Sequence, residues 1–548
     1  MARLGRPGGV VLGVAGAAAL IAGLTIFARA AGFGRIVVFS RTVGQTCLGD
    51  TYQSVNTVPN IVFEIVAGGA LASLVVPLLA GAITMGDRER ARQISGALLT
   101  WTVLALTPMA LLVVVFAEPI ATLLLGAKNC PGAVEVGASM LRVFAPQVVL
   151  YGVGIVLTGV LQAHRRFGGA ALAPLLSSLV VMAAYVVFAL RTPDDTDIDS
   201  LGLEGELVLS VGTTLGVAVL ALSLLVPSRH LGLRLRPTLR FPAGVAARAG
   251  RLAAAGVAAL VAQQIAVTVA LVLGNGAGVP AGSVTVFTYA QTIYLLPWAV
   301  LSVPIATSVF QRLADRYAAG DDPSYARTLS AATRAVVLTA LLSAAVLVAA
   351  AEPIARLLVE SAPGRPSVGP LSDGIAAFAP GLVGYGLFAL LSRALYSRGE
   401  AKSTALACVA GWLAVVAADL VLAAQFPPEQ RVLVLAAGNS IGMTLLGAAL
   451  LAVVARRAGR LALGGVGSAV AGGTLCAVVS ATAGWLLAER LDGPGLIGIL
   501  VSGAAVTLCV VALFGAMMVV VARAELRAAL SFVRRGRTPV ASDRKESR

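Results

Sequence analysis

The sequence Phe-Ala-Glu-Pro-Ile-Ala at Phe116–Ala121 returns 234 residues later as Ala-Ala-Glu-Pro-Ile-Ala at Ala350–Ala355. Two further pairs keep this offset: Phe144–Pro146 with Phe378–Pro380, and Ala72–Ser73 with Ala306–Thr307. Three matches in one register indicate an internal duplication rather than chance. The chain is therefore predicted to fold as two related halves.

Long apolar runs recur along the whole chain. Hydrophobic residues make up 58% of the 548 residues, charged residues 12%, and the mean hydropathy is +0.91; soluble domains carry about 25% charged residues. Runs of about 20 residues cross a bilayer as helices, and their continuity excludes the alternating pattern of a barrel. Fourteen spans are predicted: 10–39, 52–84, 95–116, 138–162, 169–190, 205–227, 252–274, 283–311, 327–350, 375–396, 402–424, 432–455, 465–487 and 495–522.

The repeat and the spans together predict an all-α polytopic membrane protein. The offset covers six helices, an even number, so both copies share one orientation in a parallel repeat. We expect an N-lobe at 1–240, a C-lobe at 241–460, two further helices at 461–522 and a basic tail at 523–548. Two-lobed transporters bind their cargo between the lobes. Without a Walker loop, neither ATP hydrolysis nor another enzymatic activity is predicted.

The net charge of +15 indicates the orientation of the chain in the membrane and not a nucleic-acid partner. About 31 of the 41 Lys and Arg residues fall on one side of the predicted spans, as the positive-inside rule requires. The opposite side carries the acidic stretch Asp194–Asp199. Both termini are therefore expected in the cytoplasm, and the basic loops are expected to contact the lipid headgroups of the membrane.

Two arginines, Arg29 and Arg35, interrupt the first predicted span. An Arg at a helix centre in a bilayer costs roughly 3 kcal/mol, so such residues face water, a partner or an anionic ligand. A guanidinium offers a planar fork of donors that suits the oxygens of an anionic group. The sequence pattern alone leaves all three possibilities open.

Asn56, Asn60 and Glu64 form a second polar feature, in the second predicted span. Their spacing of four residues places all three on one helical face. A cavity wall is the favoured interpretation, and a hydrogen-bonded contact between helices is the alternative.

The sequence leaves open whether Cys47 and Cys130 form a disulfide. Cys47 and Cys130 both map to outward loops, where a disulfide is chemically allowed but spacing alone does not bring two thiols together. Both a disulfide and two free thiols therefore stay open. The only histidines, His164 and His230, lie in cytoplasmic loops, and no metal site is predicted.

Several motifs together resemble the MurJ/MviN family, the lipid II flippases of the multidrug/oligosaccharidyl-lipid/polysaccharide exporter superfamily. They crowd into the first 80 residues and the region around residue 167. The matching positions are Phe27–Arg35, Gly44, Asp50, Val58–Asn60, Gly69–Leu71, Val76–Pro77, Leu161–Phe167 and Ala173–Pro174.

The resemblance implies a cargo and a mechanism. Lipid II, an undecaprenyl-pyrophosphate-linked disaccharide-pentapeptide, would move from the inner to the outer leaflet by alternating access. Arg29 and Arg35 would line a cationic cavity, and Asp50 would match the family's acidic residue at the outer end of the first helix. No cofactor is implied, and a membrane potential or ion gradient would drive transport.

The resemblance also implies an ion site in the second half. Asp419 is the acid there, and Asn439 and Thr444 offer further oxygen atoms. Coupling to Na⁺ or H⁺ would use these residues. The alternative is that Asp419 is a solvated carboxylate at the membrane boundary.

Two positions depart from the family pattern. Phe63 and Thr292 stand where basic residues are usual. Three alternatives therefore stay open. A flippase for another lipid-linked glycan would explain the missing cations. A cation-coupled multidrug exporter would need an acidic, aromatic site for cationic drugs, and the two arginines argue against such a site. A non-transporting scaffold for other cell-wall synthesis proteins would keep the fold and lose the transport activity.

Overall fold

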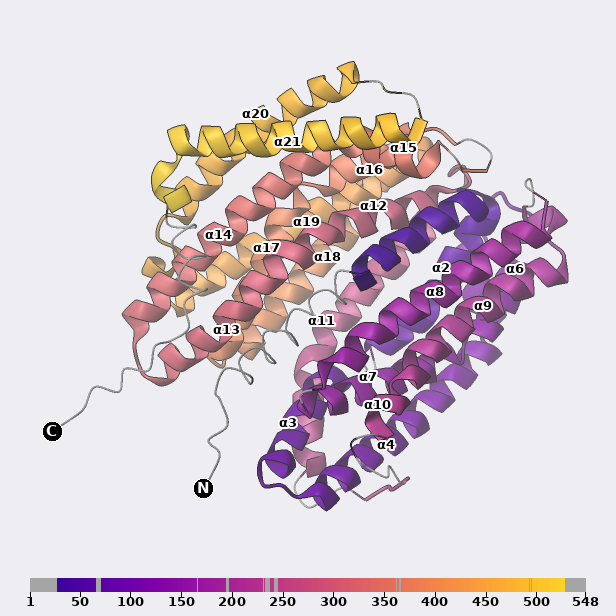
Figure 1. Cartoon of the computed structure of the whole chain (residues 1–548), viewed down its shortest axis with the longest axis horizontal. Helices are drawn as coiled ribbons and strands as arrows, with labels where there is room; N and C mark the ends of the chain where they lie inside the picture. Colours follow the sequence, from indigo (N-terminus) through magenta and orange to yellow (C-terminus); the bar gives the residue numbers. More distant parts are fainter. Residues whose placement is uncertain are drawn as a thin grey trace, which may run out of the picture. The chain divides into compact units, whose positions relative to one another are not determined.

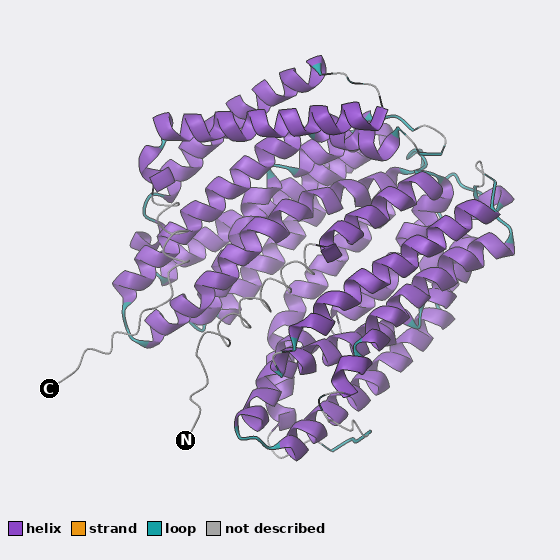
Figure 2. Ribbon diagram, viewed as in Figure 1, coloured by secondary structure: helices purple, strands orange, loops and turns teal. Residues whose placement is uncertain are grey.

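The computed structural model describes residues 27–65, 70–164, 166–193, 197–229, 231, 237–240, 245–360, 362–363, 366–491, 493 and 495–527. Across these ranges the regular structure is helical, with no strand (Figure 2). A bilayer favours this outcome because a helix satisfies its own backbone hydrogen bonds. The predicted all-α class is confirmed.

The described residues divide into two compact units, one running from residue 27 to Thr285 with residues 362, 363 and 366, the other holding the rest (Figure 1). Unit 1 contains a helix at 27–42, α2 (Cys47–Phe63), α3 (Ala70–Thr84), α4 (Arg88–Val115), α5 (Ala117–Leu125), α6 (Ala133–Phe144), α7 (Gln147–Ala163), α8 (Phe167–Arg191), α9 (Leu203–Ser223), α10 (Leu225–Arg229), α11 (Val245–Gly274) and the start of α12 (Ser283–Pro297). Unit 2 contains the rest of α12, α13 (Val303–Ala318), α14 (Asp322–Ala349), α15 (Ala351–Val359), α16 (Gly369–Phe378), α17 (Gly381–Ser397), α18 (Ala401–Gln425), α19 (Arg431–Arg457), α20 (Val466–Arg490) and α21 (Gly495–Val521).

The internal repeat is visible in the helix boundaries. Adding 234 to the bounds of α4, α5, α7 and α8 reproduces the bounds of α14, α15, α17 and α18. The short helices α5 and α15 carry the two Glu-Pro motifs with which the repeat was recognised. Each unit thus contains one copy of the same run of helices, as the duplication predicts.

The number of membrane spans is lower than predicted among the described residues. Eleven helices are long and apolar enough to cross a bilayer, or twelve if α16 and α17, bent by 42°, form one span. The predicted span 10–39 includes residues 10–26, which lie outside the described part. The predicted span 52–84 corresponds to α2 and α3, which have 17 and 15 residues. The count of fourteen is not confirmed.

The division between units falls later than the predicted boundary at residue 240. Helix α11 packs against α3 and α5 and so belongs to unit 1. The described chain passes into unit 2 only after Thr285, near the start of α12. The lobe boundaries given by the sequence stay a prediction.

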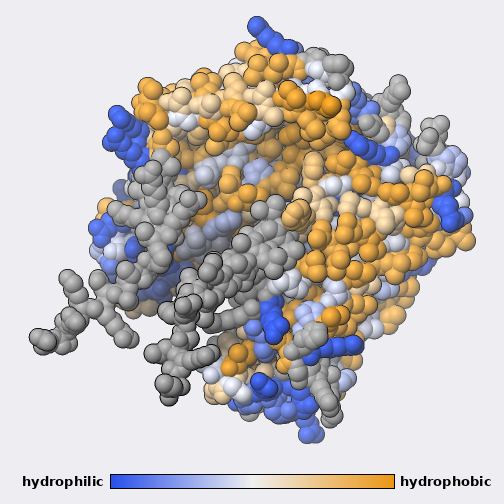
Figure 3. Space-filling model, viewed as in Figure 1, coloured by the Kyte–Doolittle hydropathy of each residue, from blue (hydrophilic) through white to orange (hydrophobic). Residues whose placement is uncertain are grey.

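Each unit presents apolar side chains outward. Examples are Leu111 and Val115 on α4, and Val501 and Leu508 on α21. Figure 3 shows hydrophobic residues over much of the face in view. Apolar surface on this scale is unfavourable in water and suits the hydrocarbon of a bilayer. The chain is a multi-pass membrane protein.

Close helix packing replaces hydrophobic burial as the stabilising interaction inside a bilayer. Gly384 of α17 lies directly against the carbonyl of Met443 in α19, so close that a Cβ at this position would overlap the α19 backbone. Backbone cannot move aside as a flexible side chain can. The contact therefore requires glycine at this position.

Gly384→Ala is expected to lower the free energy of unfolding by about 1–3 kcal/mol, the usual effect of overpacking. Thermal unfolding in detergent measures it. Gly515→Ala in α21, where nothing lies within 4 Å of the added Cβ, is the matched control and should leave the melting temperature unchanged or slightly raised. Equal melting temperatures for both variants would contradict the packing argument.

Candidate functional site

The two predicted ligand-binding arginines lie on the first described helix, 27–42, in unit 1. Arg29 and Arg35 are both exposed, and neither forms an ion pair within the part of the chain that the structure describes. Arg35 lies within electrostatic range of the hydroxyls of Tyr52 and Tyr151. Two exposed guanidinium groups without an ionic partner are available to an anionic ligand.

The predicted polar stripe shares a neighbour with Arg35, the hydroxyl of Tyr151. Asn60 contacts the hydroxyl of Tyr151 on α7, and Phe63 lies against the Tyr151 ring with centroids 5.3 Å apart. This arrangement gives Asn60 the inter-helix contact that was the alternative interpretation of the stripe. Asn56 and Glu64 are partly exposed, as a cavity wall requires. All three remain predicted site residues.

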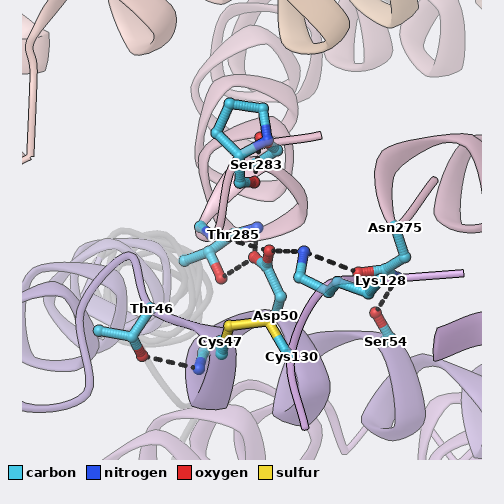
Figure 4. Close-up of polar contacts among 12 residues, drawn as sticks. Thr46, Cys47, Asp50, Ser54, Lys128, Cys130, Asn275, Ser283 and Thr285 are labelled. Atoms are coloured by element: carbon cyan, nitrogen blue, oxygen red, sulfur yellow. Dashed lines mark hydrogen bonds and ion pairs between the residues drawn. A yellow bond between two sulfur atoms is a disulfide. The ribbon is translucent and has the colours of Figure 1, made fainter. Parts of the chain in front are cut away.

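Asp50 lies in the first turn of α2, which corrects its expected place at the end of the first helix. Its side chain is fully buried, and both carboxylate oxygens are used (Figure 4). Oδ1 accepts hydrogen bonds from the backbone N–H of Thr285 at 2.8 Å and from the Thr285 hydroxyl at 2.9 Å. Oδ2 accepts the Gly282 N–H at 2.8 Å and pairs with the Lys128 ammonium.

Lys128 extends this network. Its ammonium also donates to Asn275 Oδ1 at 3.1 Å, and Asn275 Nδ2 donates to Ser54 Oγ on α2 at 2.8 Å. We call Asp50, Lys128, Ser54, Asn275, Gly282 and Thr285 the Asp50 cluster. It joins α2, the α5–α6 connection, the residue after α11 and the start of α12. The Asp50 carboxylate also acts on α12 as an N-terminal cap would, because it accepts the free N–H of Thr285 and complements the helix dipole.

Gly282 is required by the geometry of the Asp50 cluster. Its φ is +87°, a conformation that favours glycine, and an added Cβ would lie 2.5 Å from the carbonyl oxygen of Gln45. A side chain here would push the start of α12 away from Asp50.

A disulfide joins Cys47 and Cys130, with the Cα atoms 6.1 Å apart. This decides between the two states that the sequence left open. Cys47 lies one turn before Asp50, and Cys130 lies two residues after Lys128. The disulfide therefore ties together the same two segments as the Asp50–Lys128 ion pair.

Lys128 was missed by sequence reasoning. Its partner Asp50 is 78 residues away and Asn275 is 147 away, so no local pattern links them. The available signal was a lysine two residues from Cys130, on the side of the membrane predicted to be poor in basic residues.

The predicted ion-site residues lie in unit 2. Asp419 on α18 is 1% exposed, and its Oδ1 has no hydrogen-bond partner within the described residues. It faces Gly438 on α19, where a Cβ would overlap the carboxylate. The adjacent Asn439 is buried, and its Oδ1 is likewise unpaired. Thr444 is exposed, and its hydroxyl donates to the Ser440 carbonyl at 2.8 Å.

The oxygen set around Asp419 is small. A Na⁺ ion prefers several oxygen ligands, and Asp419 and Asn439 supply two side-chain oxygens that still need a partner. Within the described ranges, no group of three or more His, Cys, Asp or Glu residues could hold a metal ion. Protonation of Asp419 would neutralise the same buried carboxylate without further ligands.

A mostly apolar cavity of about 520 Å³ lies within unit 2, between α14, α15, α16 and α20. Its walls include Leu341, Ala345 and Trp485, and the carboxylates of Glu352 and Asp373 also line it. The apolar part of such a cavity suits a hydrocarbon chain.

The positions that depart from the family pattern have ordinary local roles. Phe63 packs on Tyr151, and the Thr292 hydroxyl donates to the Thr288 carbonyl at 2.8 Å. Neither residue supplies a positive charge.

A family model described as "Lipid II flippase MurJ" matches residues 39–506. The chain belongs to the MurJ family. A probable lipid II flippase MurJ of Rhizobium meliloti (strain 1021) is 26% identical over 361 residues, which span 62% of each chain. The lipid II flippase MurJ of Burkholderia cenocepacia is 24% identical over 390 residues, 70% of this chain and 73% of that protein.

Solved structures show the same fold. "Lipid II flippase MurJ, inward closed conformation" superposes with a TM-score of 0.70 at 17% identity, covering 93% of this chain and all of that one. An inward-facing MATE multidrug resistance transporter reaches 0.63 at 18% identity, covering 80% of this chain and 94% of that one. The family resemblance is confirmed, and the chain shares the fold of these two solved structures.

Replacing both Cys47 and Cys130 by Ala should lower the free energy of unfolding by roughly 2–4 kcal/mol, because the disulfide restricts the unfolded chain. Thermal unfolding with and without a reductant measures the effect. Reductant should lower the melting temperature of the wild type and leave that of the double variant unchanged. Cys509→Ala, at a free cysteine, is the control, and a reductant-insensitive wild type would contradict the disulfide.

Proposed function

We propose that this MurJ family member translocates lipid II from the inner to the outer leaflet by alternating access. The observation that carries the proposal is the pair Arg29 and Arg35, exposed and without an ionic partner in the described part of an apolar chain. Family membership and the fold support the same conclusion. The chain would act as a transporter and not as an enzyme.

The chemistry of the cargo fits these residues. A pyrophosphate carries closely spaced anionic oxygens, and two guanidinium groups bind such oxygens with directed hydrogen bonds. Asn56, Asn60 and Glu64 would contact the polar sugar and peptide groups nearby. The polyprenyl chain would stay in lipid or enter the apolar cavity of unit 2.

Asp50 would organise the outer side rather than touch the cargo. All its described hydrogen-bonding capacity is used within the protein. In this proposal the Asp50 cluster closes the outer end of the pathway, and both termini lie in the cytoplasm of a bacterial cell. Membrane lipids and other cell-wall synthesis proteins would be its neighbours.

Arg29→Ala and Arg35→Ala should each abolish rescue of a strain depleted of its own flippase, with membrane expression unchanged. Each removes a cation that the pyrophosphate needs. Arg191→Ala is the control, because Arg191 pairs with Glu204 at a site where both side chains are about two-thirds exposed, and such pairs contribute little. Full rescue by both variants would contradict the proposal.

Asp419 is proposed as the coupling site, taking a proton or Na⁺. Asp419→Asn should remove the dependence of lipid II flux on the ion gradient, because an amide can neither bind a proton at neutral pH nor carry charge. Flux into proteoliposomes under separate Na⁺ and pH gradients measures this and identifies the ion. Asp315→Asn, at an exposed acid on α13 of the same unit, is the control, and gradient-dependent flux in Asp419→Asn would refute the assignment.

A flippase for another lipid-linked glycan is the second candidate, favoured by Phe63 and Thr292 in place of cations. Competition between lipid II and other polyprenyl-pyrophosphate glycans for the purified protein distinguishes the two.

A further inference from the structure

The two long helices beside the cavity of unit 2 give the cavity a direction. Helices α14 and α20 pack against each other. Gly473 of α20 lies against Leu341 of α14, and Gly484 of α20 lies against Ala349, the last residue of α14. Contacts in this order mean that the two helices run the same way. Trp485, next to Gly484 in the cavity wall, therefore lies at the level where α14 ends.

The two carboxylates that line the cavity belong to this same end. Glu352 lies in the first turn of α15, directly after α14, and Asp373 lies on α16, which packs against α15. Glu352 pairs with Arg356 at 3.4 Å. Asp373 is exposed and forms no ion pair within the described residues. One negative charge at this end of the cavity is therefore uncompensated.

The apolar part of the cavity opens at the surface of unit 2. Val478 and Trp485 belong to its wall and are 59% and 46% exposed. Helices α14 and α20 are both long and apolar enough to span a membrane, so this surface contacts lipid. A tryptophan near the charged end matches the preference of this residue for the membrane–water interface. The cavity thus has the polarity of a phospholipid, charged at the membrane surface and apolar below it.

We propose that this cavity binds a phospholipid with a primary ammonium headgroup, phosphatidylethanolamine. Its ammonium group contacts Glu352 and Asp373, and one acyl chain lies along Leu341, Ala345 and Trp485. An ammonium group has three N–H donors, and carboxylates accept such donors in charge-assisted hydrogen bonds. The volume of about 520 Å³ lies within the range of ligand pockets, about 300–1,000 Å³.

The same charges separate this lipid from the proposed cargo. A carboxylate repels the pyrophosphate of a polyprenyl lipid, so the polyprenyl chain stays in the surrounding bilayer. Phosphatidylglycerol, whose headgroup is anionic and carries no ammonium group, is disfavoured for the same reason. The binding is measurable without transport and does not depend on the proposed function.

Quenching of Trp485 fluorescence by brominated lipids tests the proposal. Trp101, Trp298 and Trp412 are replaced by Phe in the full chain, which leaves Trp485 as the only tryptophan. The protein is reconstituted in phosphatidylcholine vesicles that contain equal fractions of phosphatidylethanolamine and phosphatidylglycerol with identical acyl chains. Bromine is placed on one or the other of these two lipids. The ratio of the two quenching signals measures which lipid is enriched beside Trp485.

With both acids present, phosphatidylethanolamine should bind roughly two- to fivefold more strongly than phosphatidylglycerol, the strength of a partly exposed ion pair. Asp373→Asn combined with Glu352→Gln should bring this ratio close to one. Glu429→Gln, at an exposed acid of the same unit outside the cavity, is the control and should keep the full preference. Polyprenyl pyrophosphate should not displace the brominated phosphatidylethanolamine.

Equal quenching by the two lipids with both acids present would overturn the inference, as would an unchanged ratio in the double variant or displacement by polyprenyl pyrophosphate. If the tryptophan substitutions prevent folding, native mass spectrometry of the otherwise unsubstituted chain replaces the quenching. The chain should then retain phosphatidylethanolamine in excess over phosphatidylglycerol, and the double variant should not. Protein that shows this preference but moves no lipid II would refute the flippase and leave the lipid site standing.

Discussion

An ionised side chain in a membrane-spanning segment has little contact with water, so it needs an ionic or hydrogen-bonding partner or a ligand. Asp50 meets this constraint inside the protein, with an ammonium, two backbone N–H groups and a hydroxyl. Arg29 and Arg35 do not meet it within the described residues. The contrast separates a self-contained cluster that holds helices together from two cations for which the described residues supply no ionic partner. Asp419, buried with an unpaired oxygen, is an intermediate case that a proton or a cation would complete.

Much of the fold could be predicted from the sequence because the helices of a membrane protein follow from local patterns in its sequence. Continuous apolar runs predict helices, and the Glu-Pro motifs at 118 and 352 predict a duplication that the bounds of α5 and α15 reproduce. A hydropathy pattern does not show where an apolar run is divided into two helices, however. The run 52–84 is predicted as one span and yet contains most of α2 and all of α3, two short helices.

Only part of the candidate site could be predicted from the sequence, for a related reason. Arg29 and Arg35 are conspicuous because they break a local pattern. The Asp50 cluster depends on contacts between residues up to 235 positions apart, which periodicity cannot show. The partners Lys128, Asn275 and Thr285 and the disulfide therefore became visible only in three dimensions. The role of Asn60 changed likewise, since its contact with Tyr151 crosses from α2 to α7.

The offset of 234 residues also relates the two sides of the Asp50 cluster. Position 51 is a threonine, and its counterpart in the second copy is Thr285, the residue that binds Asp50. The counterpart of Asp50 itself is Val284. An ancestor with identical halves and an acid at both positions would have brought two carboxylates to one buried place, where like charges repel strongly. Duplication therefore imposes divergence here: one half keeps the acid, and the other supplies the hydroxyl and amides that bind it.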